Sequence, residues 1–128
     1  MKKIYLSALL VCGSLIASAQ WKPATNNIIT PWGENLDPQH VLPEYPRPIM
    51  ERENWLNLNG LWDYTLSTKE ENNIPATFDG KILVPFAIES SLSGVGKEIG
   101  PDKSLWYHRT FSVPTDWKGK SYFSISEQ

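Results

Sequence analysis

The fold of this chain is decided by one stretch, Leu105-Trp106-Tyr107-His108-Arg109-Thr110-Phe111-Ser112-Val113. Successive side chains of an extended strand point to opposite faces. One face of this stretch therefore holds Leu105, Tyr107, Arg109, Phe111 and Val113, and the opposite face holds Trp106, His108, Thr110 and Ser112. Alternation of this kind predicts a strand over 105–113 with one buried side.

Arg109 is the one charged member of the apolar row. Burying an unpaired guanidinium costs several kcal/mol, so we expect it to meet a carboxylate or several carbonyl groups. Glu89, on the loop after Val84-Pro85-Phe86, is the expected structural partner. The alternative is that Arg109 clamps a substrate. Substrate-binding residues more often lie on loops than in the middle of a strand, which favours the structural role.

Short strands separated by turn residues extend over the rest of the chain after Arg52. Residues 60–67 place Trp62, Tyr64 and Leu66 on one face, with Leu61, Asp63 and Thr65 on the other. Residues 81–84 form a short apolar run between Asp79-Gly80 and Pro85, and residues 120–126 give a fourth candidate strand. No stretch after Arg52 has a convincing helical period, so the sequence predicts an all-β fold.

The first nineteen residues resemble a signal peptide. Lys2 and Lys3 precede an apolar run over 4–16, and Ala17-Ser18-Ala19 supplies the small residues of a cleavage site before Gln20. A permanent membrane helix needs about 20 apolar residues, and this run is shorter. We expect a periplasmic or secreted protein without a membrane partner after cleavage. A lipoprotein signal at Cys12 is the alternative, although Val11 is bulky for that cleavage position.

Removing residues 1–19 changes the inventory of reactive groups. Cys12 is the only cysteine, so the mature chain has no thiol for catalysis and no disulfide. Loss of Lys2 and Lys3 leaves 10 Lys and Arg against 14 Asp and Glu, a formal charge of −4. That balance, with no basic cluster, argues against nucleic acid as a partner. His40 and His108 are the only histidines, so we expect no metal site and no cofactor.

Residues 20–48 form a proline-rich leader, in which six prolines oppose any long regular element: Pro23, Pro31, Pro38, Pro43, Pro46 and Pro48. A short helical turn over 37–42 would have Asp37 as its N-cap and Pro38 at its first position. The leader also carries more apolar surface than a solvated linker, including Trp21, Trp32 and Tyr45. We therefore expect it to pack along the folded domain.

Six motifs follow one another along the chain: Pro46-Arg47-Pro48, Trp55-Leu56-Asn57-Leu58-Asn59-Gly60-Leu61-Trp62, Ile82-Leu83-Val84-Pro85-Phe86, Glu89-Ser90, Leu92-Ser93-Gly94 and Leu105-Trp106-Tyr107-His108-Arg109-Thr110-Phe111. In order and spacing they resemble the start of a glycoside hydrolase family 2 protein. The resemblance runs from about Thr30 to about Gly119, and the leader is similar to that of secreted Bacteroides-type members. The resemblance implies that residues 49–128 are the N-terminal half of a sugar-binding, galactose-binding-like jelly-roll β-sandwich.

The resemblance also implies a function for the parent protein. Family 2 includes β-galactosidases, β-glucuronidases and β-mannosidases, which are retaining enzymes that hydrolyse O-glycosyl bonds. Their acid/base and nucleophile are glutamates of a barrel domain, and retaining enzymes hold such a pair about 5–5.5 Å apart. None of the glutamates here matches those motifs, so we expect no catalytic residue in this chain. Carbohydrate, as a β-glycoside, would be the partner of the full-length parent.

The last residues depart from the family pattern. Where the family continues with a strand resembling Leu-Leu-His-Phe-Gly-Ala, this chain reads Ser121-Tyr122-Phe123-Ser124-Ile125-Ser126-Glu127-Gln128. A coding string permitted for residues 120–128 reads, two nucleotides later, as Lys-Leu-Phe-Leu-His-Phe-Gly-Ala. A frameshift or a broken gene prediction would therefore account for the tail, and the chain would be a fragment.

An independent carbohydrate-binding module is the alternative function. The chain has 6 Trp and 5 Tyr, and aromatic side chains offer an apolar face with a polar tip to a sugar ring. Trp62, Tyr64 and Tyr107 fall on the rows expected to face inward and are counted as core. Trp106 and His108, on the outward row, are the candidate sugar-facing residues.

Overall fold

The computed structural model describes residues 21–25, 28–44, 49, 52–71, 73–119 and 121. Short strands dominate this part of the chain, and its helices are single turns. In chain order the elements are α1 (Pro31–Glu34), β1 (Gly60–Thr68), β2 (Gly80–Val84), the 3-10 helix η2 (Ser91–Ser93), β3 (Lys103–His108) and the 3-10 helix η3 (Thr115–Trp117). The fold is β-rich, as the sequence predicted.

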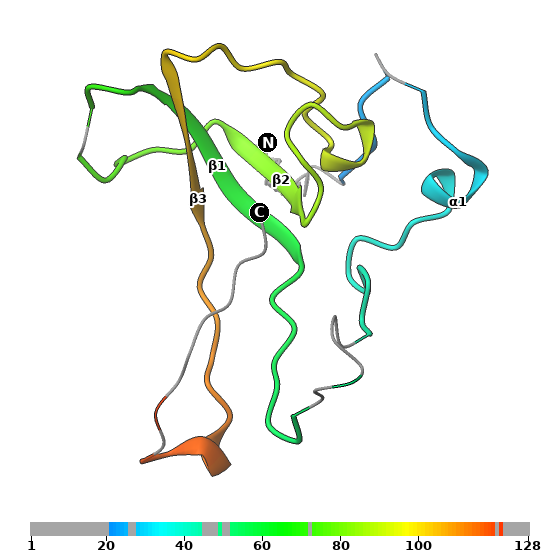
Figure 1. The fold of residues 1–128 in the computed structure, drawn as a ribbon, viewed down its shortest axis with the longest axis vertical. Coiled ribbons are helices and arrows are strands. Elements are labelled where there is room, and N and C mark those ends of the chain that lie inside the picture. The colour runs from blue at the N-terminus through cyan, green and yellow to red at the C-terminus, as the bar shows by residue number, and fades with distance from the viewer. Residues whose placement is uncertain are drawn as a thin grey trace, which may run out of the picture.

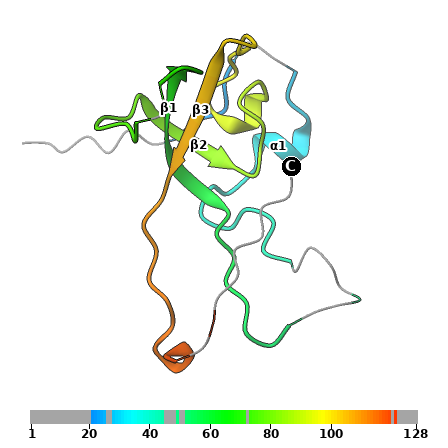
Figure 2. The same ribbon diagram turned by 60° about the vertical axis from the view of Figure 1, so that its left-hand side comes forward.

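The three strands form one antiparallel sheet in the order β2-β1-β3 (Figure 1). β1 is central, and its two halves have different partners. Residues 60–64 pair with β2, where Leu61 lies opposite Leu83. Residues 63–68 pair with β3, where Tyr64 lies opposite Tyr107. The short overlap between the two pairings makes a narrow, strongly staggered sheet, with β3 crossing one end of β1 in both ribbon views (Figure 2).

The register brings the predicted apolar rows onto a common face. Trp62 lies opposite Ile82, and Leu66 lies opposite Leu105. Because paired residues of antiparallel strands project to the same side, the row of β1 joins the rows of both neighbours. This arrangement confirms the face assignments made from the alternation in the sequence. The opposite face carries a polar cross-strand row of Lys81, Asp63 and His108.

The core lies on the apolar face, beneath the connection between β2 and β3. Tyr64 and Ile82 of the sheet are buried together with Ile88 of the connection. Partly buried side chains complete this cluster: Trp62, Leu66, Val95, Ile99 and Leu105. Full burial of such a side chain contributes roughly 1.5–3 kcal/mol, so this cluster is the main source of stability in the described part of the chain.

The connection over the core is held by one buried hydroxyl. Ser93 is fully buried, and its Oγ lies 2.7 Å from the carbonyl oxygen of Ser90 and 3.0 Å from that of Ile88. The same Oγ accepts the N–H groups of Val95 and Gly96 at 3.0 and 3.3 Å. A hydroxyl donates one proton and accepts two bonds, so this side chain is saturated. It fixes the turn that carries Ile88 and Val95 onto the sheet.

The described part of the leader lies against this connection and against the segment before β1. Trp21 Nε1 donates to the Ser93 carbonyl at 3.4 Å, and Ala24 N donates to that of Ser91 at 2.8 Å. Farther along the leader, Val41 is buried. These contacts tie residues 21–44 to the domain at two places.

The helical turn expected over 37–42 is present only as a single hydrogen-bonded turn at 37–40. The leader's helix, α1, begins seven residues before the expected one, with Pro31 at its first position and the hydroxyl of Thr30 capping Gly33 N. At Asp37 the carboxylate accepts Gln39 N at 2.9 Å, and the carbonyl accepts His40 N at 3.2 Å. These bonds close a single turn, and the chain does not continue as a helix.

The third strand is shorter than predicted. It begins at Lys103 and ends at His108, whereas the alternation predicted a strand over 105–113. Past His108 the segment no longer pairs with β1, and the side chain of Arg109 bonds to carbonyl groups of the segment before β1. The predicted strand over 120–126, apart from Ser121, and the predicted signal peptide lie outside the described residues. In the ranges that the structure describes, no helix is long and apolar enough to cross a membrane.

Candidate functional site

Arg109 joins the end of β3 to the segment before β1. Its Nη1 donates to the carbonyl oxygens of Leu58 at 2.6 Å and Asn59 at 2.8 Å. The guanidinium also lies 5.9 Å from the centre of the Trp62 ring. The indole N–H of Trp62 donates to the Leu58 carbonyl at 2.8 Å, so this oxygen accepts two bonds. Charge-assisted bonds to carbonyls offset the cost of removing half of the cation from water.

Gly60 makes room for this contact. Its φ is +125°, and a Cβ built on it would lie 3.2 Å from Arg109 Nη1. Side chains rarely adopt that backbone region, and any side chain would press on the guanidinium. The glycine therefore allows Arg109 to reach across β1 to the two carbonyl groups.

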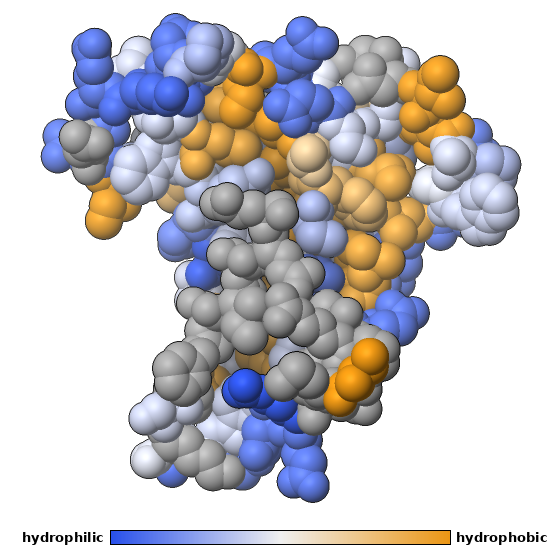
Figure 3. Space-filling model, in the orientation of Figure 1, coloured by the Kyte–Doolittle hydropathy of each residue, from blue (hydrophilic) through white to orange (hydrophobic). Residues whose placement is uncertain are grey.

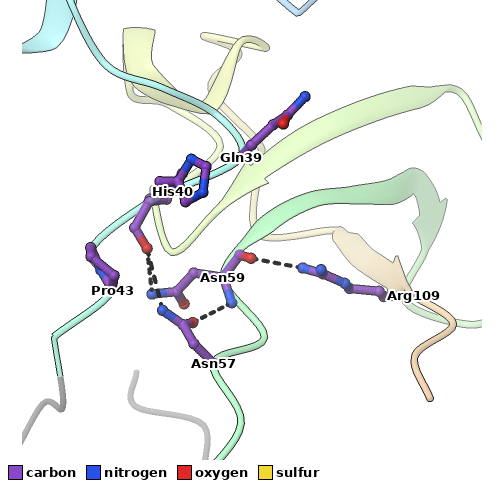
Figure 4. Close-up of a pocket in the computed structure, with 7 residues that line it drawn as sticks. Gln39, His40, Pro43, Asn57, Asn59 and Arg109 are labelled. Carbon is purple, nitrogen blue, oxygen red and sulfur yellow. Dashed lines mark hydrogen bonds between the residues drawn. The ribbon is translucent and has the colours of Figure 1, made fainter.

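A hollow of about 230 Å³ lies beside Arg109, between the leader and the segment before β1 (Figure 4). Asn57 and Asn59 line it and donate their side-chain amides to the leader, with 3.0 Å between Asn57 Nδ2 and the Leu42 carbonyl. Asn57 Oδ1 also accepts Asn59 N at 2.7 Å. Three segments distant in sequence meet here, and the complete lining is Gln39, His40, Val41, Pro43, Asn57, Asn59 and Arg109.

The polar face of the sheet holds a second cluster, centred on Asp63. The ammonium of Lys81 pairs with one carboxylate oxygen, and His108 Nδ1 lies 3.4 Å from the other. The hydrogen bond from Lys81 lowers the pKa of Asp63 below its usual value, and the bond from His108 acts in the same direction. This row of Lys81, Asp63 and His108 links all three strands on the outer face.

The two candidate sugar-facing residues lie on this outer face. His108 is exposed and stacks on Phe78, with ring centres 5.0 Å apart and planes 20° apart. Trp106 is half-buried, and its indole N–H donates to Ser67 Oγ at 2.8 Å. Both rings are fixed by neighbouring side chains. A contact of either ring with sugar stays a prediction.

Glu89, the expected partner of Arg109, is an exposed residue between β2 and η2. Its charge acts on the phenol of Tyr107: burial raises the pKa of Tyr107 above the usual value, and the negative charge of Glu89 raises it further. The bonds that hold Arg109 Nη1 go to backbone carbonyls, which were the other class of partner expected from the sequence. The pairing of Arg109 with Glu89 stays a prediction.

Part of the apolar row faces outward in the described chain. Tyr107 is 43% exposed, Phe111 52% and Val113 42%. The assignment of Tyr107 to the core is therefore only partly correct, since its ring packs edge-on against Trp62 and its outer side is open. In the space-filling view, apolar side chains gather in the upper centre of the molecule, and further apolar groups lie among hydrophilic ones at its margins (Figure 3).

Sequence reasoning missed three of the polar side chains that organise these sites. Asn57 and Asn59 belong to the motif over 55–62, and Asp79 belongs to the turn before 81–84, but no role was predicted for these side chains. In the structure, Asp79 Oδ2 accepts Thr65 Oγ1 at 2.9 Å and Leu66 N at 3.1 Å. The bond from Leu66 N is the main cause that lowers the pKa of Asp79, and the bond from Thr65 acts in the same direction. An Asn-x-Asn pair before a strand and an Asp-Gly pair before its partner are the signals that could have indicated such anchors.

The arrangement is suited to binding through hydrogen bonds and charge. Within the described ranges, no group of three or more His, Cys, Asp or Glu side chains could hold a metal ion. No protein-family model matches the chain, and no curated protein matches it.

Proposed function

We propose that this chain is the N-terminal part of the sugar-binding β-sandwich of a secreted or periplasmic family 2 β-glycosidase. The apolar row of β3 carries the proposal. It begins in the core at Leu105 and continues, through Tyr107, to the exposed Phe111 and Val113. A sheet face of this kind is stable when a second layer covers it, and a jelly roll provides that layer from a second sheet.

The edge of the sheet supports the same proposal. In the part of the chain that the structure describes, β3 is an edge strand that pairs with β1 on one side, so a further strand could pair with its other side. The described sheet has three strands, fewer than the roughly four to six that are commonest in folded domains. The remaining strands of the sandwich would pair with this edge and bury the row of β3. Together with the order of the motifs, this favours half of a sandwich over a finished small module.

In the proposed protein the chain contributes binding and architecture, and the hydrolytic step belongs to a barrel domain that carries two glutamates. The DNA that follows codon 128, read in all three frames, tests this directly. We expect an open frame that restores a Leu-Phe-Leu-His-Phe-Gly-Ala strand and continues into a barrel with that glutamate pair. A downstream region that encodes no glycosidase in any frame would refute the proposal and leave the independent module.

Activity provides a second check. Because both catalytic carboxyl groups are assigned to the barrel, the purified mature chain should hydrolyse aryl β-glycosides no faster than a buffer blank. If the chain did hydrolyse these substrates, and a substitution such as Glu89→Gln abolished the hydrolysis, the assignment of both catalytic carboxyl groups to the barrel would be wrong.

A further inference from the structure

The hollow beside Arg109 has a distinctive electrostatic lining. Its walls come from the leader on one side and from Asn57, Asn59 and Arg109 on the other (Figure 4). Arg109 is its permanent cation, and no aspartate or glutamate is among the residues that line it. The carboxylate of Asp37, on the leader, is bound to the lining residue His40 at 2.7 Å. The lining therefore presents positive charge and polar groups.

Among the residues that the structure describes, the hydrogen bonds of Arg109 are made by one nitrogen of its guanidinium. A guanidinium has five N–H donors arranged as a planar fork. The two carbonyl bonds of Arg109 both use Nη1, which has two of the five. Nε and Nη2 carry the other three. Nε with Nη2 forms the edge of the fork that matches a carboxylate in a bidentate pair.

The position of the guanidinium is fixed in advance. Trp62 lies against it at 5.9 Å, and the carbonyl groups of Leu58 and Asn59 hold Nη1. The asparagine amides that line the hollow are bound to the carbonyl groups of Val41 and Leu42, which fixes the opposite wall. A donor that is already ordered loses little conformational freedom when it binds a ligand.

We propose that this hollow binds a small carboxylate through Arg109. Ligand pockets for drug-sized molecules typically have volumes of about 300–1,000 Å³. At about 230 Å³, this hollow fits one small acid, or the carboxylate end of a longer one. The proposal does not depend on the proposed function, because it rests on Arg109 and the leader alone.

Acetate is the probe, and acetamide is its uncharged analogue of nearly the same shape. Each is titrated into the full chain at constant ionic strength, balanced with chloride, while the Arg109 Nε–H and the amides of Asn57 and Asn59 are followed by ¹⁵N NMR. We expect saturable shifts with acetate and at least a tenfold weaker response to acetamide. Equal responses to both probes, or no saturable shift with acetate, would overturn the proposal.

Two variants separate the site from a general effect of charge. Arg109→Lys keeps the charge and loses the fork, so the apparent Kd for acetate, read from the Asn57 and Asn59 amides, should rise at least tenfold. His40→Trp fills the hollow from an exposed leader position and leaves the carbonyl bonds of Arg109 in place, so it should abolish the acetate response even if Arg109→Lys fails to fold. Lys81→Gln, on the outer face, is the matched control and should bind acetate as the wild type does. Binding that survives in His40→Trp would show that acetate binds elsewhere.

Discussion

At the residue scale, Arg109 decides where the sheet ends. The alternation of 105–113 predicted an uninterrupted strand, and the observed strand stops one residue before Arg109. The guanidinium takes the carbonyl groups of Leu58 and Asn59, which lie just before β1. A long side chain thus replaces the backbone pairing that would have continued the strand. The alternation of apolar and polar residues identified which side chains share a face of the strand. It contains no information about a hydrogen bond from a side chain to a distant carbonyl group.

Gly60→Ala tests the space that this contact needs. The variant would hold alanine at φ +125° with its Cβ 3.2 Å from Arg109 Nη1. We expect the free energy of unfolding, measured by urea titration, to fall by about 1–3 kcal/mol. Gly80→Ala is the control, because Gly80 is not in the left-handed region and its Cβ would make only an ordinary 3.4 Å contact with Tyr64. Equal losses in the two variants would argue against a special role for Gly60.

At the element scale, the connection between β2 and β3 covers part of the apolar face of the sheet. Its side chains Ile88, Val95 and Ile99 cover the apolar face where the sheet is widest. The strands β1 and β2 were predicted nearly to the residue, because their patterns and their bounding turn residues agree. The covering loop was not predicted, since its position depends on the hydrogen bonds of Ser93 and on the docking of Trp21, neither of which has a periodic signal.

Ser93→Ala removes the hydroxyl that organises this connection. The N–H of Gly96 would lose this acceptor in a buried site and that of Val95 in a partly buried one, and the side-chain bond to the carbonyl groups of Ser90 and Ile88 would be lost. Leaving a buried donor unsatisfied costs about 1–3 kcal/mol, and we expect the free energy of unfolding to fall by that amount. Ser104→Ala on β3 should change it by less than about 0.5 kcal/mol. A Ser93 variant as stable as the Ser104 variant would show that the turn holds without this hydroxyl.

At the scale of the whole molecule, the two faces of the sheet have different roles. The apolar face is covered near β2 and open at the end of β3, where Tyr107 leads to Phe111. The opposite face carries Lys81, Asp63 and His108, which interact with one another across the strands, together with the fully buried Leu83. An apolar face that is only partly covered is what half of a sandwich would present. The row of apolar residues was readable from the sequence, whereas the hollow at Arg109 depends on three segments meeting and was not.

Carboxylates anchor three separate parts of this molecule, and this makes its stability sensitive to acid. Hydrogen bonds lower the pKa values of three aspartates: Asp37 in the leader, Asp63 in β1 and Asp79 before β2. For Asp37 the main cause is the hydrogen bond with His40. A carboxyl group whose pKa is lower in the folded state than in the unfolded chain stabilises the fold at any pH above its unfolded pKa, near 3.9. This contribution is lost as the pH falls through the pKa of the folded state.

The free energy of unfolding, measured by urea titration from pH 7 to pH 3, should therefore be nearly flat down to about pH 5 and then decrease steadily below about pH 4. Asp63→Asn is the matched variant, since it keeps the shape of the side chain and removes one of the three groups. It should be less stable than the wild type at pH 7, and the gap should narrow toward pH 3, where the wild-type carboxylate also becomes protonated. No gap at pH 7, or a gap that stays constant down to pH 3, would show that the charge of Asp63 does not stabilise the fold through its pairing with Lys81.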